Sequence, residues 1–105
     1  ADNYDKKINN KKILKLTYSK NSVYHQYVIL VKKRNVLINY LKKSNIQYGF
    51  HYPYAIHELH VFKGYFKNEK FPNSEILSRY GISIPIDPNL TKKQISYVIN
   101  KLNSF

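Results

Sequence analysis

The stretch VYHQYVILV, residues 23–31, predicts a buried β-strand and with it the class of the fold. It is rich in β-branched and aromatic residues, which suit a pleated, covered surface. Successive strand residues point to opposite faces of a sheet, and both alternating sets are largely apolar here. One set is Val23, Tyr27, Ile29 and Val31, and the other is Tyr24, Val28 and Leu30. We therefore expect this strand to be covered on both faces.

A helix and a second strand are predicted directly after this stretch. Residues 33–44 place apolar side chains at helical spacing, namely Val36, Leu37, Tyr40 and Leu41. Lys42 and Lys43 suit the negative end of the helix dipole, and Asn45 is placed to stop the helix. Residues 46–52 return as a strand, and the sequence leaves open whether the two strands run parallel or antiparallel.

A short helix, a short strand and a turn are predicted in the second half of the chain. Asn73 or Ser74 can cap the helix, and Gly81 would end it in the left-handed conformation. Residues 82–86 then form a strand and residues 87–89 a turn. The side chains of the short helix that we expect to face inward are Ile76, Leu77 and Tyr80.

Both ends of the chain are predicted to be helical. Residues 2–10 are typical of the end of a helix, with Tyr4 and Ile8 on one face. Near the other end, Thr91 and Gln94 form a capping box for the last helix. The apolar face of that helix is Ile95, Val98, Ile99 and Leu102.

These elements predict an α+β two-layer sandwich, with a small, mostly antiparallel sheet of three or four strands and about three helices on one face. The 105 residues make one domain. Helices starting near Lys33, Asn73 and Thr91 can cover one face of the sheet, but too little chain remains to cover the other. We therefore expect a partner domain outside this sequence to cover the second face.

The composition favours a soluble cytoplasmic protein without a membrane partner. Cysteine is absent, which excludes disulfides and thiolate zinc sites, and no apolar stretch approaches the roughly 20 residues of a membrane span. The net charge of +12 raises the alternative of a free-standing basic module that binds nucleic acid or another polyanion. Arginine is scarce among the 18 basic residues, and many lysines lie near predicted helix ends, which disfavours this alternative.

Residues 49–60, GFHYPYAIHELH, hold the side chains best suited to a binding site. Their histidine and tyrosine rings can stack on a flat ligand and hydrogen-bond its edges, and the proline stiffens the turn. No cysteine, Ser-His-Asp order, Gly-rich phosphate loop or carboxylate pair lies nearby, so the main chemistry is not encoded here. A zinc site of His51, His57, His60 and Glu58 is a weaker alternative, because nothing in the sequence would orient such ligands.

A spaced set of short motifs runs from about Tyr24 to Leu102. The set is Tyr27-Val28-Ile29, Arg34, Leu41, Asn45-Ile46, His51-Tyr52-Pro53, His57, Phe71-Pro72, Ser74-Glu75, Ser83-Ile84-Pro85, Pro88 and Leu90-Thr91. In this order the motifs resemble the C-terminal small domain of the DegT/DnrJ/EryC1/StrS family of sugar aminotransferases. Each motif alone is a weak signal, whereas the spaced set is fairly specific.

This resemblance implies a fold-type I enzyme that uses pyridoxal phosphate to transfer an amino group, usually from glutamate, to a keto sugar carried on a nucleotide. It also implies a homodimer and a role in polysaccharide biosynthesis. Residues 1–10 would match the end of the helix that joins two domains, and residues 11–105 the small domain. In the family, a larger N-terminal domain supplies the lysine that binds the cofactor. No lysine here lies in a matching segment, so we expect this chain alone to bind no cofactor and to be inactive.

The resemblance also implies that the histidine-rich loop lies near the mouth of the active site and positions substrate. His51 and Tyr52 are the first candidates, and His57 is the second. Tyr54, His60 and Ser83 follow, and no catalytic, cofactor-binding or metal-binding residue is assigned. A purely structural role is the alternative for each candidate, such as His51 capping a strand end. A dehydratase relative, in which the cofactor-binding lysine is replaced, is a further alternative within the family.

Overall fold

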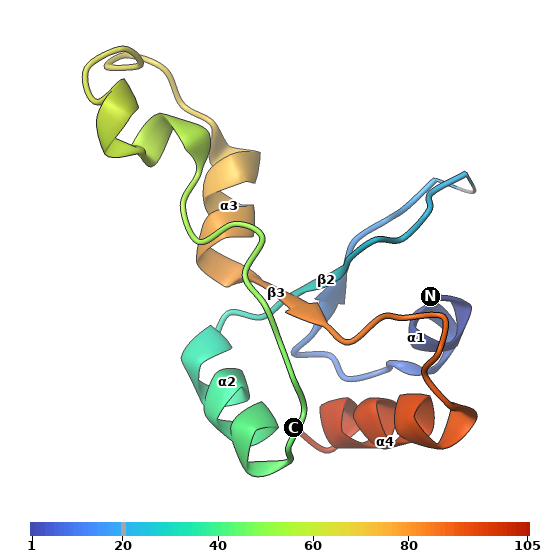
Figure 1. Ribbon diagram of the computed structural model, residues 1–105. Helices are drawn as coiled ribbons and strands as arrows, with labels where there is room; N and C mark the ends of the chain where they lie inside the picture. Colours follow the sequence, from blue (N-terminus) through green and yellow to red (C-terminus); the bar gives the residue numbers. More distant parts are fainter. Residues whose placement is uncertain (20) are drawn as a thin grey trace.

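The computed structural model describes residues 1–19 and 21–105, and places three strands in one antiparallel sheet of order β1-β2-β3 (Figure 1). The register of the main pair sets Ile29 opposite Ile82 and Leu30 opposite Gly81. Along the chain the elements are α1 (Asp2–Lys7), β1 (Leu14–Lys15), β2 (Tyr27–Leu30), α2 (Arg34–Lys43), the 3-10 helices η1 (Ile56–Glu58) and η2 (His60–Phe62), α3 (Pro72–Tyr80), β3 (Gly81–Ile84) and α4 (Lys92–Asn103). This arrangement confirms the predicted α+β class and the small antiparallel sheet.

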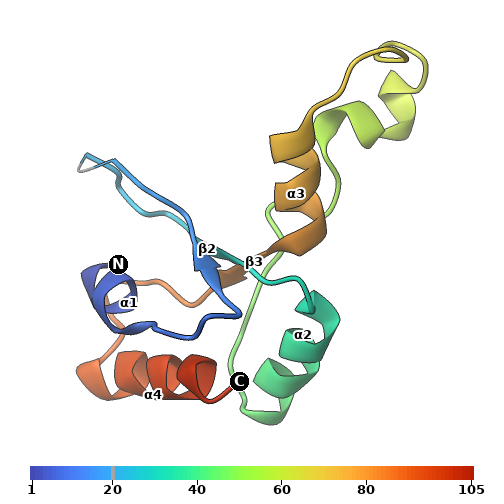
Figure 2. The same ribbon diagram turned by 180° about the vertical axis from the view of Figure 1, so that it is seen from behind.

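One face of the sheet and three helices form the hydrophobic core. Tyr27 pairs with Ile84 and Ile29 with Ile82, so these four side chains share a face, and all are buried. Helices α1, α2 and α4 supply most of the remaining core (Figures 1 and 2), and the segments between the elements add Ile8, Ile13, Val31 and Ile46. Their buried side chains are Tyr4, Leu37, Leu41, Val98, Ile99 and Leu102.

The second face of the sheet is only partly covered within this chain. Val28 and Leu30 of β2 point to it and are half-buried, and Leu14 of β1 is exposed. The prediction that the chain covers one face and leaves the other without a helical layer is therefore confirmed. Within the described residues the core face of the strand is covered, and the expectation that a partner domain covers the second face stays a prediction.

The ends of α2 and α4 match their sequence signals. Asn45 has a φ of 52°, and the amide of Ile46 donates to the carbonyl of Leu41 at 3.0 Å, which closes α2 as a Schellman motif. At the start of α4 the amide of Gln94 donates to Thr91 Oγ1 at 3.2 Å, and its side-chain oxygen accepts from the Thr91 amide at 2.9 Å. The end of α2 and the start of α4 could be predicted from the sequence, because each depends on residues that are neighbours in the chain.

The strand predicted over residues 23–31 is too long at its start. β2 begins at Tyr27, and Val23, which was expected to be covered on the same face as Tyr27 and Ile29, is 89% exposed. Tyr24 has a φ of 47°, which is outside the extended region, so regular pairing cannot continue through it. Residues 16–19 and 21–26 instead project from the sheet as an arm (Figure 1).

The strand predicted over residues 46–52 is reduced to a single bridge between Gly49 and Ser83. Ile46 is buried, and Tyr48 and Phe50 pack against the core, so the alternating pattern does report burial. The pattern does not report backbone hydrogen bonding. Within the described residues of this segment, only Gly49 makes backbone hydrogen bonds to a strand. The short strand β1, at Leu14 and Lys15, was missed, because two residues carry no periodic signal.

Helix α3 is formed differently from the prediction. It starts with Pro72 in its first turn after Phe71, so neither Asn73 nor Ser74 is the cap. It extends away from the sheet instead of lying on it (Figure 1), and Ile76 and Leu77 are therefore more than two-fifths exposed. α1 takes the place in the helical layer that was expected for α3. No helix among residues 1–19 and 21–105 is long and apolar enough to cross a bilayer.

Candidate functional site

His51 lies beside the bridge between the loop and β3, and three neighbours define its position. Its Nδ1 lies 2.9 Å from Oγ of Ser83, which is buried. Its ring meets that of Tyr52 edge to face at 6.0 Å, across a cis peptide bond. A Cβ on Gly49 would lie 2.7 Å from His51 Cε1, so the glycine leaves the room that the imidazole occupies. The imidazole is thus held in place although the residue is exposed.

A hollow of about 230 Å³ adjoins His51 on the partly covered side of the sheet. Its lining comes from the arm, β2 and α3, and includes Leu16, Tyr18, Tyr24, Gln26, Val28 and Leu77. The rings of Tyr18 and Tyr24 lie 4.9 Å apart, and the Tyr18 hydroxyl accepts from the Val28 amide at 3.1 Å. This hollow offers aromatic faces, an amide and an imidazole to a small polar ligand.

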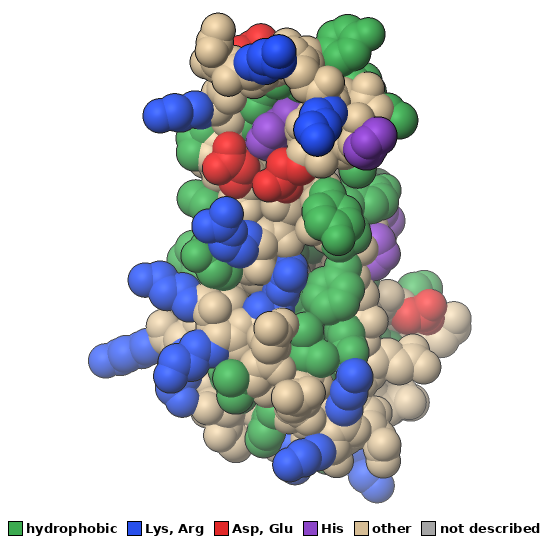
Figure 3. Space-filling model, turned by 90° about the vertical axis from the view of Figure 1, so that its left-hand side faces the viewer, with side chains coloured by type: hydrophobic (Ala, Val, Ile, Leu, Met, Phe, Trp, Pro, Cys, Tyr) green, Lys and Arg blue, Asp and Glu red, His purple; other side chains and the backbone are tan. Residues whose placement is uncertain are grey.

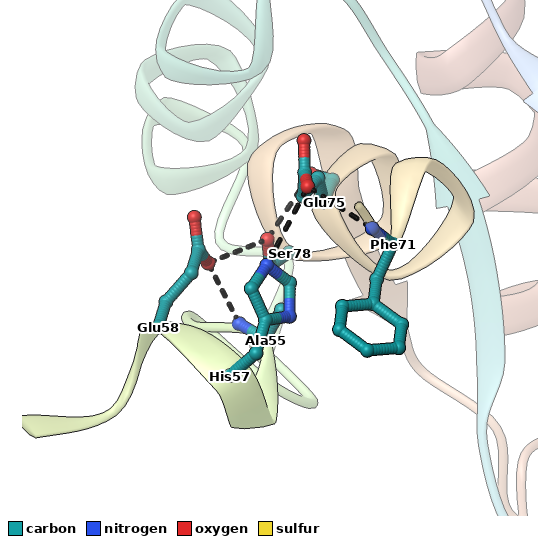
Figure 4. A network of polar contacts seen from close by, with 6 residues as sticks. All are labelled: Ala55, His57, Glu58, Phe71, Glu75 and Ser78. Carbon is teal, nitrogen blue, oxygen red and sulfur yellow. Dashed lines mark hydrogen bonds and ion pairs between the residues drawn. The ribbon is translucent and has the colours of Figure 1, made fainter. Parts of the chain in front are cut away.

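His57 belongs to a separate cluster, which joins η1 to α3 (Figure 4). Its Nε2 lies 3.4 Å from Oε1 of Glu75, and its ring centroid lies 4.8 Å from that of Phe71. The His57 side chain is only 16% exposed. These contacts hold the loop against α3, so in this chain His57 is occupied by protein groups.

Glu58 completes this cluster. Its Oε2 accepts from the Ala55 amide at 2.9 Å and lies 3.5 Å from Oγ of Ser78, a buried serine of α3 (Figure 4). The Ser78 hydroxyl also donates to the carbonyl of Glu75 at 3.1 Å. Glu58, the acidic residue beside His57, therefore stabilises the conformation of the loop itself.

Tyr54 and His60 do not converge on either histidine, whereas the Tyr52 ring contacts that of His51. Tyr52 is 74% exposed and Tyr54 is 64% exposed, and His60 is also exposed. Among residues 1–19 and 21–105, no three histidine, aspartate or glutamate side chains are placed to share a metal ion. The structure thus brings His51 together with Ser83 and Tyr52, and it sets His57 apart with Glu58 and Glu75.

Sequence reasoning missed the aromatic cluster at the base of the arm. Tyr4, Tyr18, Tyr24 and Tyr27 have neighbouring ring centroids between 4.9 and 6.4 Å apart. The Tyr27 hydroxyl donates to Asp5 Oδ1, and burial, followed by this carboxylate, raises the pKa of Tyr27 well above its usual range. The sequence signal for the cluster was the pair Tyr24 and Tyr27, which flank His25 and Gln26 and were interpreted only as part of a strand.

A second hollow, of about 750 Å³, lies on the partly covered side of the molecule. Its apolar lining includes Leu14, Leu30, Val36, Ile76, Tyr80 and Phe105. Lys11, Lys12, Lys32 and Lys33 surround it. Figure 3 shows Lys and Arg side chains from the top to the bottom of one face of the molecule.

Comparison with known proteins identifies relatives over almost the whole chain. The model of the DegT/DnrJ/EryC1/StrS aminotransferase family matches residues 1–103. A curated relative, dTDP-3-amino-3,6-dideoxy-alpha-D-galactopyranose transaminase of Aneurinibacillus thermoaerophilus, is 31% identical over 90 residues, which are 86% of this chain and 24% of that protein. The chain therefore spans about a quarter of the length of this relative.

Solved structures share the fold. DesV of S. venezuelae superposes with a TM-score of 0.88 at 23% identity, over 98% of this chain and 29% of DesV. The sugar aminotransferase Spr1654 of Streptococcus pneumoniae, in its PLP form, gives a TM-score of 0.78 at 22% identity, over 98% of this chain and 28% of that protein. At these identities the likeness concerns the fold, and it agrees with the predicted small domain of fold-type I enzymes.

Proposed function

The chain belongs to the DegT/DnrJ/EryC1/StrS aminotransferase family, and from this membership we propose that it is the C-terminal small domain of a sugar aminotransferase. The proposed enzyme transfers an amino group, from glutamate, to a keto sugar linked to a nucleotide. The match of the family model over residues 1–103 carries the proposal. A dehydratase relative remains the alternative within the family, and a cytoplasmic location stays a prediction.

We propose that residues 1–10 end an interdomain helix, that residues 11–105 form the small domain, and that a cofactor domain packs on the partly covered face. Leu14, Val36 and Ile76 are 63%, 54% and 43% exposed there, although apolar side chains of this size gain free energy on burial. The hollow that they line is large enough to receive side chains of a neighbouring domain. The proposed enzyme is a homodimer of the joined domains.

Pyridoxal phosphate, held by the cofactor domain, would act as the electron sink of the reaction. This chain would contribute groups that orient the sugar nucleotide. His51 and Tyr52 can donate hydrogen bonds to phosphate or sugar oxygens; both are exposed, and His51 lines the hollow at the arm. Tyr54 is an exposed secondary candidate, and His57 would help indirectly by holding the loop against α3.

The test joins this chain to the cofactor domain of a family transaminase and measures amino transfer from glutamate to nucleotide-linked keto sugars. We expect activity from the joined protein and none from the 105-residue chain alone, which should also lack the cofactor's absorbance band. His51→Ala and Tyr52→Phe should raise KM for the nucleotide sugar about three- to tenfold, the loss of about one hydrogen bond each. Tyr65→Phe, at another exposed tyrosine, is the matched control.

A joined protein that processes no nucleotide sugar would contradict the proposal, and so would a yellow, active preparation of the chain alone. Steeply salt-dependent binding of the chain to arbitrary DNA would instead favour the alternative of a polyanion-binding module. The family match does not favour that alternative.

A further inference from the structure

Ser83 occupies an unusual position for a polar residue. It lies in β3 opposite Val28, on the face of the sheet away from the core, and is only 7% exposed. Its amide and carbonyl are both used by Gly49, at 2.9 and 3.0 Å. The backbone of Ser83 is therefore saturated, and only the hydroxyl is free to serve the loop.

The hydroxyl of Ser83 carries one proton, which a buried site does not leave unpaired without cost. Within residues 1–19 and 21–105, the one hydrogen-bond partner of Ser83 Oγ is Nδ1 of His51, at 2.9 Å. The hydroxyls of Ser78 and Ser104 differ, because each donates to a carbonyl of its own helix. If the hydroxyl proton of Ser83 is paired within these residues, its acceptor is therefore Nδ1 of His51.

We propose that Ser83 is a positioning residue that donates to Nδ1 and so holds neutral His51 in the tautomer with its proton on Nε2. The other ring nitrogen then faces outward as a hydrogen-bond donor. Such a donor fits an acceptor oxygen, of a phosphate or a sugar, and not the hydroxyl proton of a sugar. This inference rests on the proposed function only in taking the nucleotide sugar as the ligand.

Gly49 also helps to hold the His51 ring in its position beside Ser83. A Cβ at this position would lie 2.7 Å from Cε1 and 3.4 Å from Nδ1 of His51, so any larger residue would push the ring away from Ser83. The bridge between Gly49 and Ser83 fixes the distance between the two residues that contact the ring. Loop and strand therefore determine the orientation of the imidazole together.

The experiment is ¹⁵N NMR of the histidine side chains in the 105-residue chain without ligand. We expect His51 to show one tautomer, with Nδ1 unprotonated and Nε2 protonated. Ser83→Ala should convert this signal to that of two exchanging tautomers, as at an exposed histidine. Gly49→Ala should do the same although the hydroxyl remains, because the ring is displaced from it.

Ser96→Ala, at an exposed serine of α4, is the matched control, and the signals of His25 and His60 are internal references. Amide spectra of each variant verify that the fold is kept. A parent chain in which Nδ1 of His51 carries the proton would overturn the inference. So would a His51 signal that both variants leave unchanged.

The joined protein supplies a separate readout. Ser83→Ala should raise KM for the nucleotide sugar about three- to tenfold and change kcat less, because it removes orientation of a binding group. Inorganic diphosphate and a free hexose, added separately to the chain, distinguish phosphate from sugar oxygens through the His51 Nε2 signal. The tautomer of His51 is measured without substrate. The prediction of the Nε2-protonated form can therefore be wrong while aminotransferase activity is found, or right while no activity is found.

Discussion

Gly81 joins α3 to β3 at a position that has no room for a Cβ atom. Its φ of −69° and ψ of 139° are open to any residue, so the left-handed stop predicted from the sequence is wrong. A Cβ there would lie 2.4 Å from the carbonyl oxygen of Leu77, within the last turn of α3. The glycine allows the chain to leave the helix and enter the sheet without a connecting loop.

We therefore expect Gly81→Ala to lower the free energy of unfolding by about 2 kcal/mol, because the backbone must shift to relieve the contact. Gly81→Asn should cost at least as much, whereas asparagine would be tolerated at a left-handed position. Urea unfolding measures both, with Ser74→Ala on the exposed side of α3 as control. A Gly81→Asn variant as stable as the parent would restore the original interpretation.

Two buried tyrosines link the N-terminal helix to the sheet. The Tyr4 hydroxyl donates to the carbonyl of Pro85 at 2.7 Å, and the Tyr27 hydroxyl donates to Asp5. Burial raises the pKa of Tyr4 to about 12, since an ionised phenol is poorly solvated inside the protein. Both phenols therefore resist ionisation in the folded state.

Stability should consequently fall in alkaline solution. Above about pH 10 the Tyr4 phenol ionises in the unfolded chain, while the folded chain keeps its proton up to a pKa of about 12. Its contribution is complete below pH 10 and is lost as the pH rises through this interval. Tyr4→Phe should be less stable at pH 8, by about 1 kcal/mol for the lost hydrogen bond, but should lose less stability between pH 8 and 11 than the parent.

Urea unfolding at the two pH values provides the comparison, and Tyr52→Phe, at an exposed tyrosine, serves as control. An equal loss of stability in the parent and in Tyr4→Phe would show that Tyr4 does not cause the alkaline decline.

At the scale of elements, residues 55–71 and α3 form a unit that is held by polar contacts and by ring contacts among Phe62, Phe66 and Phe71. None of its side chains belongs to the core cluster around Leu37 and Ile29. The polar contacts are those of His57 with Glu75 and of Glu58 with Ala55 and Ser78 (Figure 4). Such a unit can open locally while the core stays folded.

Glu58→Ala should therefore increase amide hydrogen exchange over residues 55–62 by tenfold or more, because the loop loses its acceptor. Global stability should change by less than about 1 kcal/mol, since no core contact is removed. Glu69→Ala, an exposed glutamate of the same segment, should change neither quantity. Equal amide hydrogen exchange in Glu58→Ala and Glu69→Ala would show that Glu58 does not hold the loop in place.

The whole molecule is more extended than a self-contained domain of this length. Its radius of gyration is 15.2 Å, with extents of 48 × 32 × 24 Å, against about 13 Å for a compact chain of 100 residues. α3 and the arm account for the excess, since both project from the sheet (Figures 1 and 2). The exposed Ile76 and Leu77 of α3 lie on the side that we propose for the cofactor domain.

Ile76→Asp tests this assignment. In the chain alone it should change the free energy of unfolding by less than about 0.5 kcal/mol, because the side chain is exposed. In the joined protein it should weaken domain packing and lower amino transfer at least tenfold. Ser96→Asp on the outer face of α4 should affect neither protein, and a joined Ile76→Asp enzyme of full activity would contradict the proposed interface.

The sequence by itself determined the features that neighbouring residues control. The Schellman stop at Asn45, the capping box of Thr91 and Gln94 and the buried face of α4 follow from groups within one or two turns. The spaced motifs of the sequence also point to the family that the family model matches over residues 1–103.

Only the tertiary structure decided the features that distant residues impose. The backbone bends at Tyr24 beside Tyr18 and Tyr27, and α3 leaves the sheet because Gly81 continues directly into β3. His51 and His57 are close in the sequence, yet they belong to different clusters, since Ser83 contacts one and Glu75 the other. Such pairings depend on how the strands and helices pack, and a local pattern carries no information about a partner that lies far along the chain.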